Sequence, residues 1–332
     1  MNEKYINKLL VGNALTKLKH LEDDSIDLII TSPPYWNAVV YDKDVNTDYE
    51  TYLNLLNDIF SECSRILRPN GKIAINTPLM PIPQSLIKQD VRHLKDISSD
   101  LSEKILSNTE LNLFSVYIWQ KQTSKLMFGS YPYPGNLLEN NTIEFIKVYV
   151  KPGKSKKYQK NVKENEKLKK HEWVDLIQQV WFMIPEDISR KKNHPAPFPE
   201  KLPARLMRMF SYGAFNSFKG DIILDPFVGT GTTCVVAKKM NRRFIGIDIS
   251  ASYIEHAKSK LYKAKPNEQV NFLVGKATHE NKKELDENWE FIRKKRNKKI
   301  DDEVLEKHIK KNRDLRYGRN LKKKKEQSTF EF

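Results

Sequence analysis

The sequence predicts a protein of the α/β class, because short apolar runs bounded by Gly, Asn, Asp or Pro alternate with amphipathic segments along most of the chain. Length and composition agree with this class. The 332 residues are 39% hydrophobic and 30% charged, which suffices for a substantial core and for roughly two domains. Disorder of the whole chain is therefore excluded.

The apolar runs predict seven strands, with helices between them. The strands are Lys8–Val11, Ile26–Thr31, Lys72–Asn76, Phe114–Gln120, Ile143–Val150, Asp221–Leu224 and Arg243–Ile247. A core-facing helix is expected over residues 51–67, where apolar residues recur every three or four positions until the stop at Pro69-Asn70-Gly71. Residues 232–240 and 251–261 each follow a strand directly and are predicted to be helices as well.

Three segments depart from this alternation. Residues 79–112 begin among prolines and continue as a polar, helix-leaning insert, and residues 152–193 begin with a lysine-rich stretch. Residues 279–332 form a highly charged tail. The two internal segments are therefore predicted to be insertions into the main domain.

The positive charge of the chain is concentrated in two stretches. Residues 151–170 hold nine Lys and two acids, and residues 282–325 hold eighteen Lys and Arg and nine acids, so the two stretches carry the whole formal net charge of +16. Localised positive charge suits a polyanion such as nucleic acid. Residues 151–170 are the favoured contact, because they interrupt the main domain. A solvated lysine-rich surface without a partner is the alternative for each stretch.

A soluble, cytoplasmic protein is expected. The chain has no run of about 18 apolar residues and no basic-then-apolar leader, so neither a membrane span nor export is predicted. Its two cysteines, Cys63 and Cys234, form neither a CxxC pair nor a Cys/His cluster. A disulfide scaffold and a metal site are therefore not expected.

The first motif, Thr31-Ser32-Pro33-Pro34-Tyr35-Trp36, directly follows an apolar run. Loops at the carboxyl ends of parallel strands form the ligand crevice of an open sheet. The prolines leave rigid carbonyl acceptors beside a hydroxyl and an aromatic ring. Ser32 and the Pro33 carbonyl could accept hydrogen bonds from the exocyclic amino group of a base, while Tyr35 stacks on its ring. A Pro-Pro strand terminator with a packed aromatic side chain is the structural alternative.

The second motif, DPFVGTGTT at residues 225–233, follows a strand and opens a helix. Glycines at such a turn let the backbone approach a ligand closely. The motif lacks both the GxxxxGK[ST] pattern of a Walker loop and the third glycine of GxGxxG. Asp248 ends the next strand, at a position suited to hold ribose hydroxyls. These features predict a nucleoside cofactor without a pyrophosphate.

Together these motifs resemble those of the amino-methylating DNA methyltransferases that use S-adenosylmethionine. The resemblance rests on SPPY at 32–35, DPFVGTGTT at 225–233 and NHPAPFPEKLPARLM at 193–207, and extends to LLVGNAL at 9–15, SYPYPGN at 130–136 and EFIKVYVKPG at 144–153. It covers roughly residues 5–265. The catalytic motif precedes the cofactor motif, which is similar to the β group of the family, whose chain is circularly permuted.

The resemblance implies a Rossmann-like methyltransferase fold, with a seven-stranded, mostly parallel sheet and helices on both faces. Its catalytic domain would comprise residues 1–78, 113–151 and 194–278, and the inserted segments 79–112 and 152–193 would be candidates for target recognition. The implied catalytic residues are Ser32, Pro33, Pro34 and Tyr35. The implied residues around the methionine part of the cofactor are Asp225, Phe227, Gly229, Gly231 and Thr232.

The resemblance also assigns the rest of the cofactor site. Asp248 would bind the ribose, and Phe198 would line the pocket unless it is simply packed inside a prolyl turn. Asn13 stands where the family usually has Asp to hold the adenine amino group. An amide oxygen can still accept that hydrogen bond, so weaker or differently oriented adenine binding is expected.

The implied function is methylation of the exocyclic N4 of a flipped-out cytosine in double-stranded DNA, because Ser at the first motif position leans toward cytosine in this family. Adenine N6 is the runner-up. A non-catalytic DNA-binding subunit with this fold, or a methylase of RNA or of a protein amide, are alternatives. A cognate restriction endonuclease would be a separate chain, and the sequence leaves both a monomer and a homodimer open.

Overall fold

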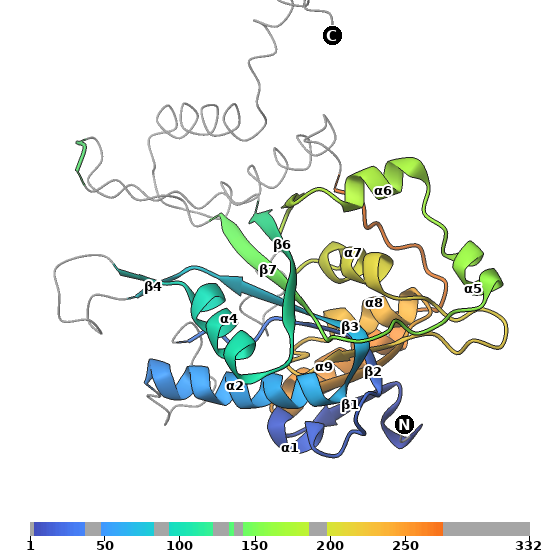
Figure 1. Ribbon diagram of the computed structural model, residues 1–332, viewed down its shortest axis with the longest axis horizontal. Coiled ribbons are helices and arrows are strands. Elements are labelled where there is room, and N and C mark those ends of the chain that lie inside the picture. The colour runs from blue at the N-terminus through green and yellow to red at the C-terminus, as the bar shows by residue number, and fades with distance from the viewer. Residues whose placement is uncertain are drawn as a thin grey trace, which may run out of the picture. The chain divides into compact units, whose positions relative to one another are not determined.

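The computed structural model describes residues 3–36, 48–82, 93–121, 133–135, 142–185 and 198–274. All of them belong to the first of two units, Met1–Val274. Within this unit a sheet of eight strands lies between two layers of helices (Figure 1). The α/β class and the predicted helices on both faces are confirmed.

The sheet is parallel except for one strand. In the order β1-β10-β9-β2-β3-β7-β6-β8, β7 alone runs antiparallel to its neighbours among these described strands. The bounds are β1 Lys8–Val11, β2 Ile26–Thr31, β3 Leu67–Pro78, β6 Asn112–Lys121, β7 Ile143–Val150, β8 Val180–Met183, β9 Ile222–Asp225 and β10 Arg243–Asp248. Two short strands, β4 Met80–Ile82 and β5 His93–Lys95, pair separately.

The predicted count of seven strands in the sheet is wrong by one. The additional strand is β8, which pairs in parallel with β6 at the edge of the sheet. Its apolar run is bounded by Gln179 and Pro185, but it lies within the segment predicted to be an insertion. Trp181 of this strand is fully buried and stacks on Tyr117 of β6. The segment 152–193 therefore contributes to the core.

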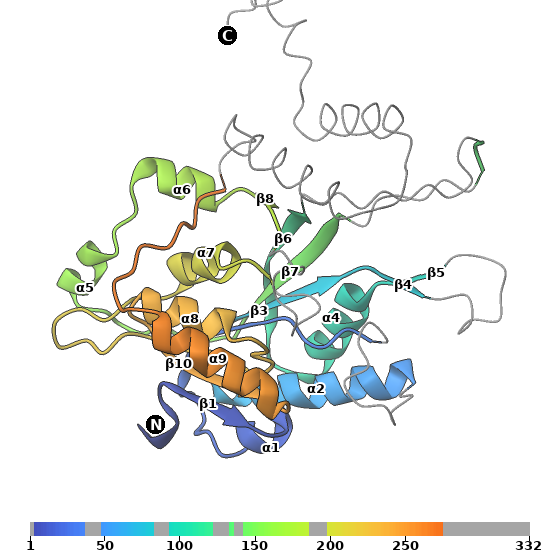
Figure 2. The ribbon, with the colours of Figure 1, turned by 180° about the vertical axis from the view of Figure 1, so that it is seen from behind.

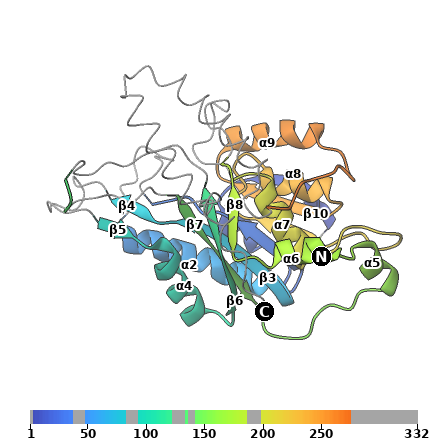
Figure 3. The same cartoon turned by 90° about the horizontal axis from the view of Figure 1, so that it is seen from above.

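Helices cover the sheet on both faces, as the view from above shows (Figure 3). One layer contains α1 Ala14–Leu18, α2 Tyr49–Ile66 and α4 Ile97–Asn108, and the other contains α7 Lys201–Phe210, α8 Thr232–Lys239 and α9 Ala251–Lys263. From behind, α9 is seen in front of β10 and β1 (Figure 2). The remaining helical elements are the 3-10 helix Glu3–Tyr5, α5 Lys160–Asn165 and α6 Lys170–Leu176.

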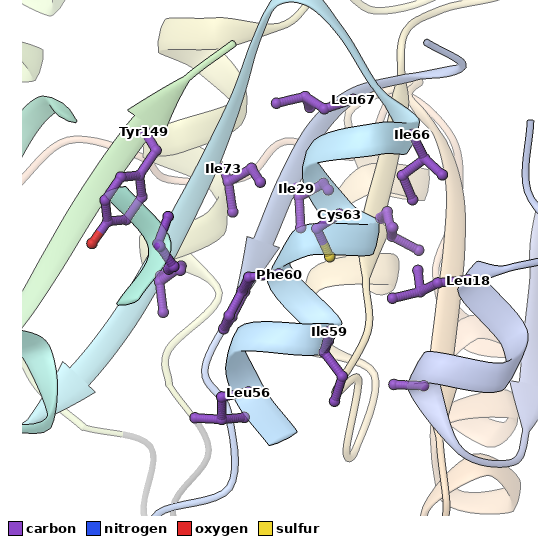
Figure 4. Close-up of a cluster of buried hydrophobic side chains, with 14 of the residues drawn as sticks. Leu18, Ile29, Leu56, Ile59, Phe60, Cys63, Ile66, Leu67, Ile73 and Tyr149 are labelled. Atoms are coloured by element: carbon purple, nitrogen blue, oxygen red, sulfur yellow. The ribbon is translucent and has the colours of Figure 1, made fainter. Parts of the chain in front are cut away.

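The predicted helix over 51–67 is α2, and its apolar face forms the centre of one core. Phe60 and Cys63 point from α2 toward Ile29 of β2 and Ile73 of β3 (Figure 4). The helix ends at Ile66, three residues before Pro69. Such burial of an apolar stripe against a sheet is the main source of stability for a helix of this kind.

The helix α4 extends this same layer, although it lies in the segment 79–112. Ile97, Leu101 and Ile105 are buried in the core that α2 forms, and Asp96 caps the helix by accepting a hydrogen bond from Ser99 N–H. The amphipathic pattern of α4 is thus explained by packing. If the segment 79–112 contacts bases, its residues outside the buried face of α4 would do so.

The strand order creates a switch point between β9 and β2. These two strands are parallel neighbours, but the chain passes from β9 to β10 on one side and from β2 to β3 on the other. Crevices for ligands open at the carboxyl ends of the strands at such a point. Both sequence motifs lie there, because one follows β2 and the other follows β9.

Candidate active site

The two motifs are joined by a buried carboxylate. Thr31 Oγ1 donates to Asp225 Oδ1 at 2.7 Å, and Thr233 Oγ1 donates to Asp225 Oδ2 at 2.6 Å. The Phe227 N–H also donates to Oδ1, at 3.1 Å. Burial raises the pKa of Asp225 to about 6, although these hydrogen bonds act in the opposite direction. Both carboxylate oxygens therefore hold the chain's own loops together.

The glycine-rich loop is shaped around a second carboxylate. Asp248 Oδ2 accepts from the Gly229 N–H at 2.8 Å, and Oδ1 accepts from the Ser250 N–H at 2.8 Å. Burial raises the pKa of Asp248, whereas the two N–H groups lower it. Gly231 has φ +86°, and a Cβ there would lie 2.6 Å from the Cβ of Ala257. Thr232 begins α8 directly after this glycine. The loop can lie this close to Ala257 of α9 only with glycine at position 231.

Asn13 lies beside Asp248 but also has a structural task. It follows β1, and the Gly12 N–H donates to the Asp248 carbonyl at 2.9 Å. The Asn13 side chain caps α1, because its Oδ1 accepts from the Thr16 N–H at 3.3 Å. Both Asp and Asn cap helices well, which is one physical reason why Asn is accommodated where the family usually has Asp.

Two aromatic residues complete the predicted cofactor set, and they belong to different layers. Phe227 is partly buried against the core of α2, and Phe198 is partly buried against the core of α7 and α8. Asn13, Asp248 and the loop after Asp225 are brought together by adjacent strands. Phe198 packs against the cluster that also contains Val228 of this loop, and its role toward the cofactor stays a prediction.

The SPPY loop is held by hydrogen bonds from two strands and a helix. Ser32 Oγ lies 2.9 Å from the Tyr35 hydroxyl and donates to the Asn76 carbonyl at 3.0 Å. The Tyr52 hydroxyl of α2 donates to the Pro34 carbonyl at 2.9 Å. Pro33 is buried beside it. The Pro34 carbonyl is thus already engaged, which leaves the Pro33 carbonyl as the expected acceptor for a ligand.

Tyr35 is anchored through its hydroxyl. This group donates to Glu144 Oε2 at 3.3 Å, while the residue as a whole keeps part of its surface exposed. Burial of the hydroxyl and the nearby Glu144 charge raise the pKa of Tyr35 well above its ordinary value. The phenol therefore stays protonated, and its ring orientation is fixed by the two partners of the hydroxyl.

Sequence reasoning missed three residues at this edge: Asn76, Lys121 and Glu144. Lys121 Nζ donates to Glu144 Oε1 at 2.9 Å, and Asn76 Nδ2 donates to Glu144 Oε2. The buried Asn76 Oδ1 accepts no hydrogen bond from any described residue. Each is a polar residue at the end of an apolar strand, which was a readable signal. Their meeting depends on the reversed direction of β7, which brings its start to the ends of β3 and β6.

Two lysines of the basic stretch 151–170 form ion pairs with acids of the same chain. Lys151 is buried and pairs with Asp24 at 2.8 Å and with Glu110 at 3.2 Å. Lys156 pairs with Asp27 at 3.0 Å and with Asp221 at 2.7 Å. Asp27 and Asp221 lie at the starts of β2 and β9, opposite the edge with the motifs. Lys151 and Lys156 thus serve as counter-charges for the chain's own acids, with Lys151 buried and Lys156 partly exposed, while the phosphate contact expected of the whole stretch stays a prediction.

The chain resembles known proteins over most of its length. The model of the DNA methylase family matches residues 26–259, and a general methyltransferase domain matches residues 217–325. The Type II methyltransferase M.HpaI of Haemophilus parainfluenzae is 30% identical over 266 residues, which are 76% of this chain and 74% of that protein.

Solved structures give a similar result. TTHA0409 of Thermus thermophilus, solved in complex with S-adenosyl-L-methionine, has a TM-score of 0.62 and 29% identity, and covers 78% of this chain and 95% of its own. The cytosine-N4-specific PvuII DNA methyltransferase has a TM-score of 0.59 at 16% identity, with 85% of this chain and 92% of that chain covered. At such low identity the second match shows the fold alone.

Proposed function

This chain belongs to the DNA methylase family, and we propose that it transfers the methyl group of S-adenosylmethionine to N4 of a flipped-out cytosine in double-stranded DNA. Adenine N6 is the alternative target. The hydrogen bond between Thr31 and Asp225 carries the proposal. It fixes the loop that would hold the base against the loop that would hold the cofactor.

The cofactor is S-adenosylmethionine, the ligand with which TTHA0409 was solved, and the residues of this site fit it. Asp248 is partly exposed and could bind ribose hydroxyls, and Asn13 beside it is exposed. Gly229 and Gly231 have positive φ and leave backbone rather than side chains facing a ligand. When bound, the cofactor supplies an electrophilic methyl group on a positively charged sulfur.

The chain's own residues would orient the base. Ser32 Oγ and the Pro33 carbonyl would accept the two hydrogens of the amino group, and Tyr35 would stack on the ring. A base amino group is a poor nucleophile because its lone pair is delocalised into the ring. Two acceptors that draw its hydrogens out of the ring plane would free that lone pair. Ser32 carries no charge, which favours cytosine in this family's pattern.

The identity of the methylated base is tested by nucleoside mass spectrometry of DNA from a host that expresses the protein. The proposal expects N4-methylcytosine, which the uninduced host must lack. N6-methyladenine instead would replace the target base and keep the enzyme class. Absence of both would favour a non-catalytic subunit of the same fold, or an RNA or protein target.

Replacement of Ser32 by Ala should lower turnover at least about 100-fold, the scale typical of losing one positioned hydrogen-bonding group in an active site. The dissociation constant of the cofactor should change little, since Ser32 contacts Tyr35 and Asn76 rather than the cofactor loop. Asp248→Ala should do the reverse and weaken cofactor binding about ten- to hundredfold. Calorimetry and single-turnover assays separate the two effects. Normal turnover of Ser32→Ala would remove its assigned role.

Double-stranded DNA is the proposed partner, and the tail 279–332 becomes the stronger basic candidate now that Lys151 and Lys156 are committed to ion pairs. Truncation after Lys276 should weaken DNA binding and flatten the slope of log affinity against log salt by about one unit for each phosphate that the tail neutralises. Cofactor affinity should not change. Unchanged DNA affinity and slope would instead identify the tail as a solvated segment.

The wider setting follows from the same proposal. A Type II methyltransferase that marks a specific sequence would act in a restriction-modification system, with its endonuclease on a separate chain. The described parts of 79–112 and 152–193 include α4 and β8, which pack into the core. Target recognition is therefore proposed for the rest of these segments. None of the described helices is long and apolar enough to cross a membrane.

A further inference from the structure

The proposed function assigns no role to the buried acid Glu144. It is 6% exposed, and its side chain lies within hydrogen-bonding distance of Tyr35, Asn76 and Lys121. Burial of a carboxylate is costly unless it is paired and hydrogen bonded. The Lys121 ammonium supplies the counter-charge at 2.9 Å. The fold therefore maintains a charged group just behind the SPPY loop.

The proposed reaction needs such a group. When the amino nitrogen forms its bond to the methyl carbon and the carbon–sulfur bond breaks, the nitrogen acquires a positive charge. The methylated amine becomes neutral only when it loses one of its hydrogens as a proton. Ser32 is neutral and cannot retain that proton, so an acceptor must lie beyond it.

A continuous path of oxygens leads from Ser32 to Glu144. Ser32 Oγ is 2.9 Å from the Tyr35 hydroxyl, which is 3.3 Å from Glu144 Oε2. Both hydroxyls can donate one hydrogen while accepting another. The high pKa of Tyr35 excludes the phenol as a resting anion, so it can pass a proton on but does not keep one.

We propose that Glu144 is the final acceptor of the proton released by methyl transfer, reached through the hydroxyls of Ser32 and Tyr35. This inference rests on the proposed function. The amino proton moves to Ser32 Oγ, the Ser32 hydrogen turns from the Asn76 carbonyl to the Tyr35 oxygen and is transferred there, and the Tyr35 hydrogen moves to Glu144 Oε2. Both hydroxyls are restored, the product amine is neutral, and Glu144 becomes a carboxylic acid that later loses its proton to water. Glu144 acts through Tyr35 and is thus a positioning and proton-accepting residue.

The groups that face Glu144 make this role testable. From β6 comes Lys121, from β3 the uncharged Asn76, and from the SPPY loop the titratable Tyr35. Lys121 thus provides the positive charge among these contacts. Its removal would leave the buried carboxylate without its counter-charge.

The test is the pH dependence of single-turnover methyl transfer at saturating S-adenosylmethionine and DNA. The wild-type rate should rise with pH and then level off, because the relay needs an acceptor that does not already hold a proton. Glu144→Gln should be at least about 100-fold slower and lack that rise. Lys121→Met should change this pH profile, because the carboxylate loses its counter-charge. Tyr35→Phe, which keeps the ring, should match Glu144→Gln, and the double variant should be no slower than either single variant.

Controls separate this role from a structural one. Glu103→Gln, at an exposed position on α4, should retain the wild-type profile. Glu144→Gln should bind cofactor and DNA with unchanged constants, and the lost pair with Lys121 should appear as a lower unfolding temperature rather than as weaker binding. A wild-type protein that methylates neither base would overturn the proposed function itself. If the wild type methylates DNA, a normal rate in Glu144→Gln would overturn the relay but not the proposed function. An unchanged pH profile in Lys121→Met, or losses that multiply in the double variant, would do the same.

Discussion

Lys156→Met should lower the free energy of unfolding by about 3 kcal/mol or more at neutral pH, the scale measured when one partner of a buried ion pair is removed. Its Nζ lies 3.0 Å from Asp27 Oδ1 and 2.7 Å from Asp221 Oδ1. These carboxylates are 5% and 0% exposed. Arg68 at 3.2 Å would remain near Asp27, whereas the other hydrogen bonds to the Asp221 carboxylate from described residues come from neutral donors, the Tyr158 hydroxyl and the Tyr212 N–H. Denaturant unfolding measures the loss.

The loss should also depend on pH in a defined direction. Burial and the neighbouring Asp27 already raise the pKa of Asp221, and Lys156 opposes them. Without the lysine that pKa rises further, so the folded state holds the Asp221 proton more tightly than the unfolded state does. Stability is then lost as pH rises through this window. The deficit of Lys156→Met should therefore be smaller at pH 5 than at pH 8.

Lys157→Met is the matched control, because Lys157 is the exposed neighbour of Lys156. Its stability should stay within about 0.5 kcal/mol of the wild type. Lys156→Met should also leave the salt dependence of DNA binding unchanged, since the lysine serves the opposite edge of the sheet. A flatter salt slope with normal stability would restore Lys156 as a phosphate contact.

Lys156 illustrates why the charge pattern of a sequence predicts poorly where a charged side chain lies in the fold. The excess of Lys over acids in 151–170 is correct, but its acidic partners Asp24, Asp27, Glu110 and Asp221 are distant in sequence. A pairing of that kind depends on the tertiary fold. Periodicity, in contrast, is local, and it located α2, α8 and α9 and six of the seven predicted strands within a few residues. The seventh, over 72–76, is the longer β3, which starts at Leu67.

In the candidate active site too, the sequence revealed local motifs but not the contacts between residues that lie far apart in the chain. The motifs indicated the loops after β2 and β9, which lie on neighbouring strands of the sheet. The motifs did not reveal that Thr31 and Asp225 bind each other across 194 positions of the chain. The sequence marked Glu144 only as a polar residue at the end of an apolar strand, because its contacts with Tyr35 and Lys121 come from other elements.

Asp225 therefore has a different expected behaviour from that of a simple cofactor ligand. With a pKa of about 6 in the folded protein and about 3.9 when unfolded, it binds its proton more tightly in the folded state. Its ionisation should cost stability of the order of 2–3 kcal/mol, lost as pH rises from about 4 to 6 and constant above that.

Asp225→Asn should abolish this loss, so that its stability relative to the wild type increases between pH 4 and 6. The amide can keep the network, since its oxygen can accept from Thr31 and the Phe227 N–H while its NH₂ donates to Thr233. Asp225→Ala leaves three buried donors without an acceptor, and should be destabilised by about 2–4 kcal/mol at every pH. Unfolding at several pH values measures both variants. If the Asp225 carboxylate only holds the loops together, the dissociation constant of S-adenosylmethionine for Asp225→Asn should stay within about threefold of the wild-type value. An affinity loss of about tenfold or more would mean that the Asp225 charge contacts the cofactor directly.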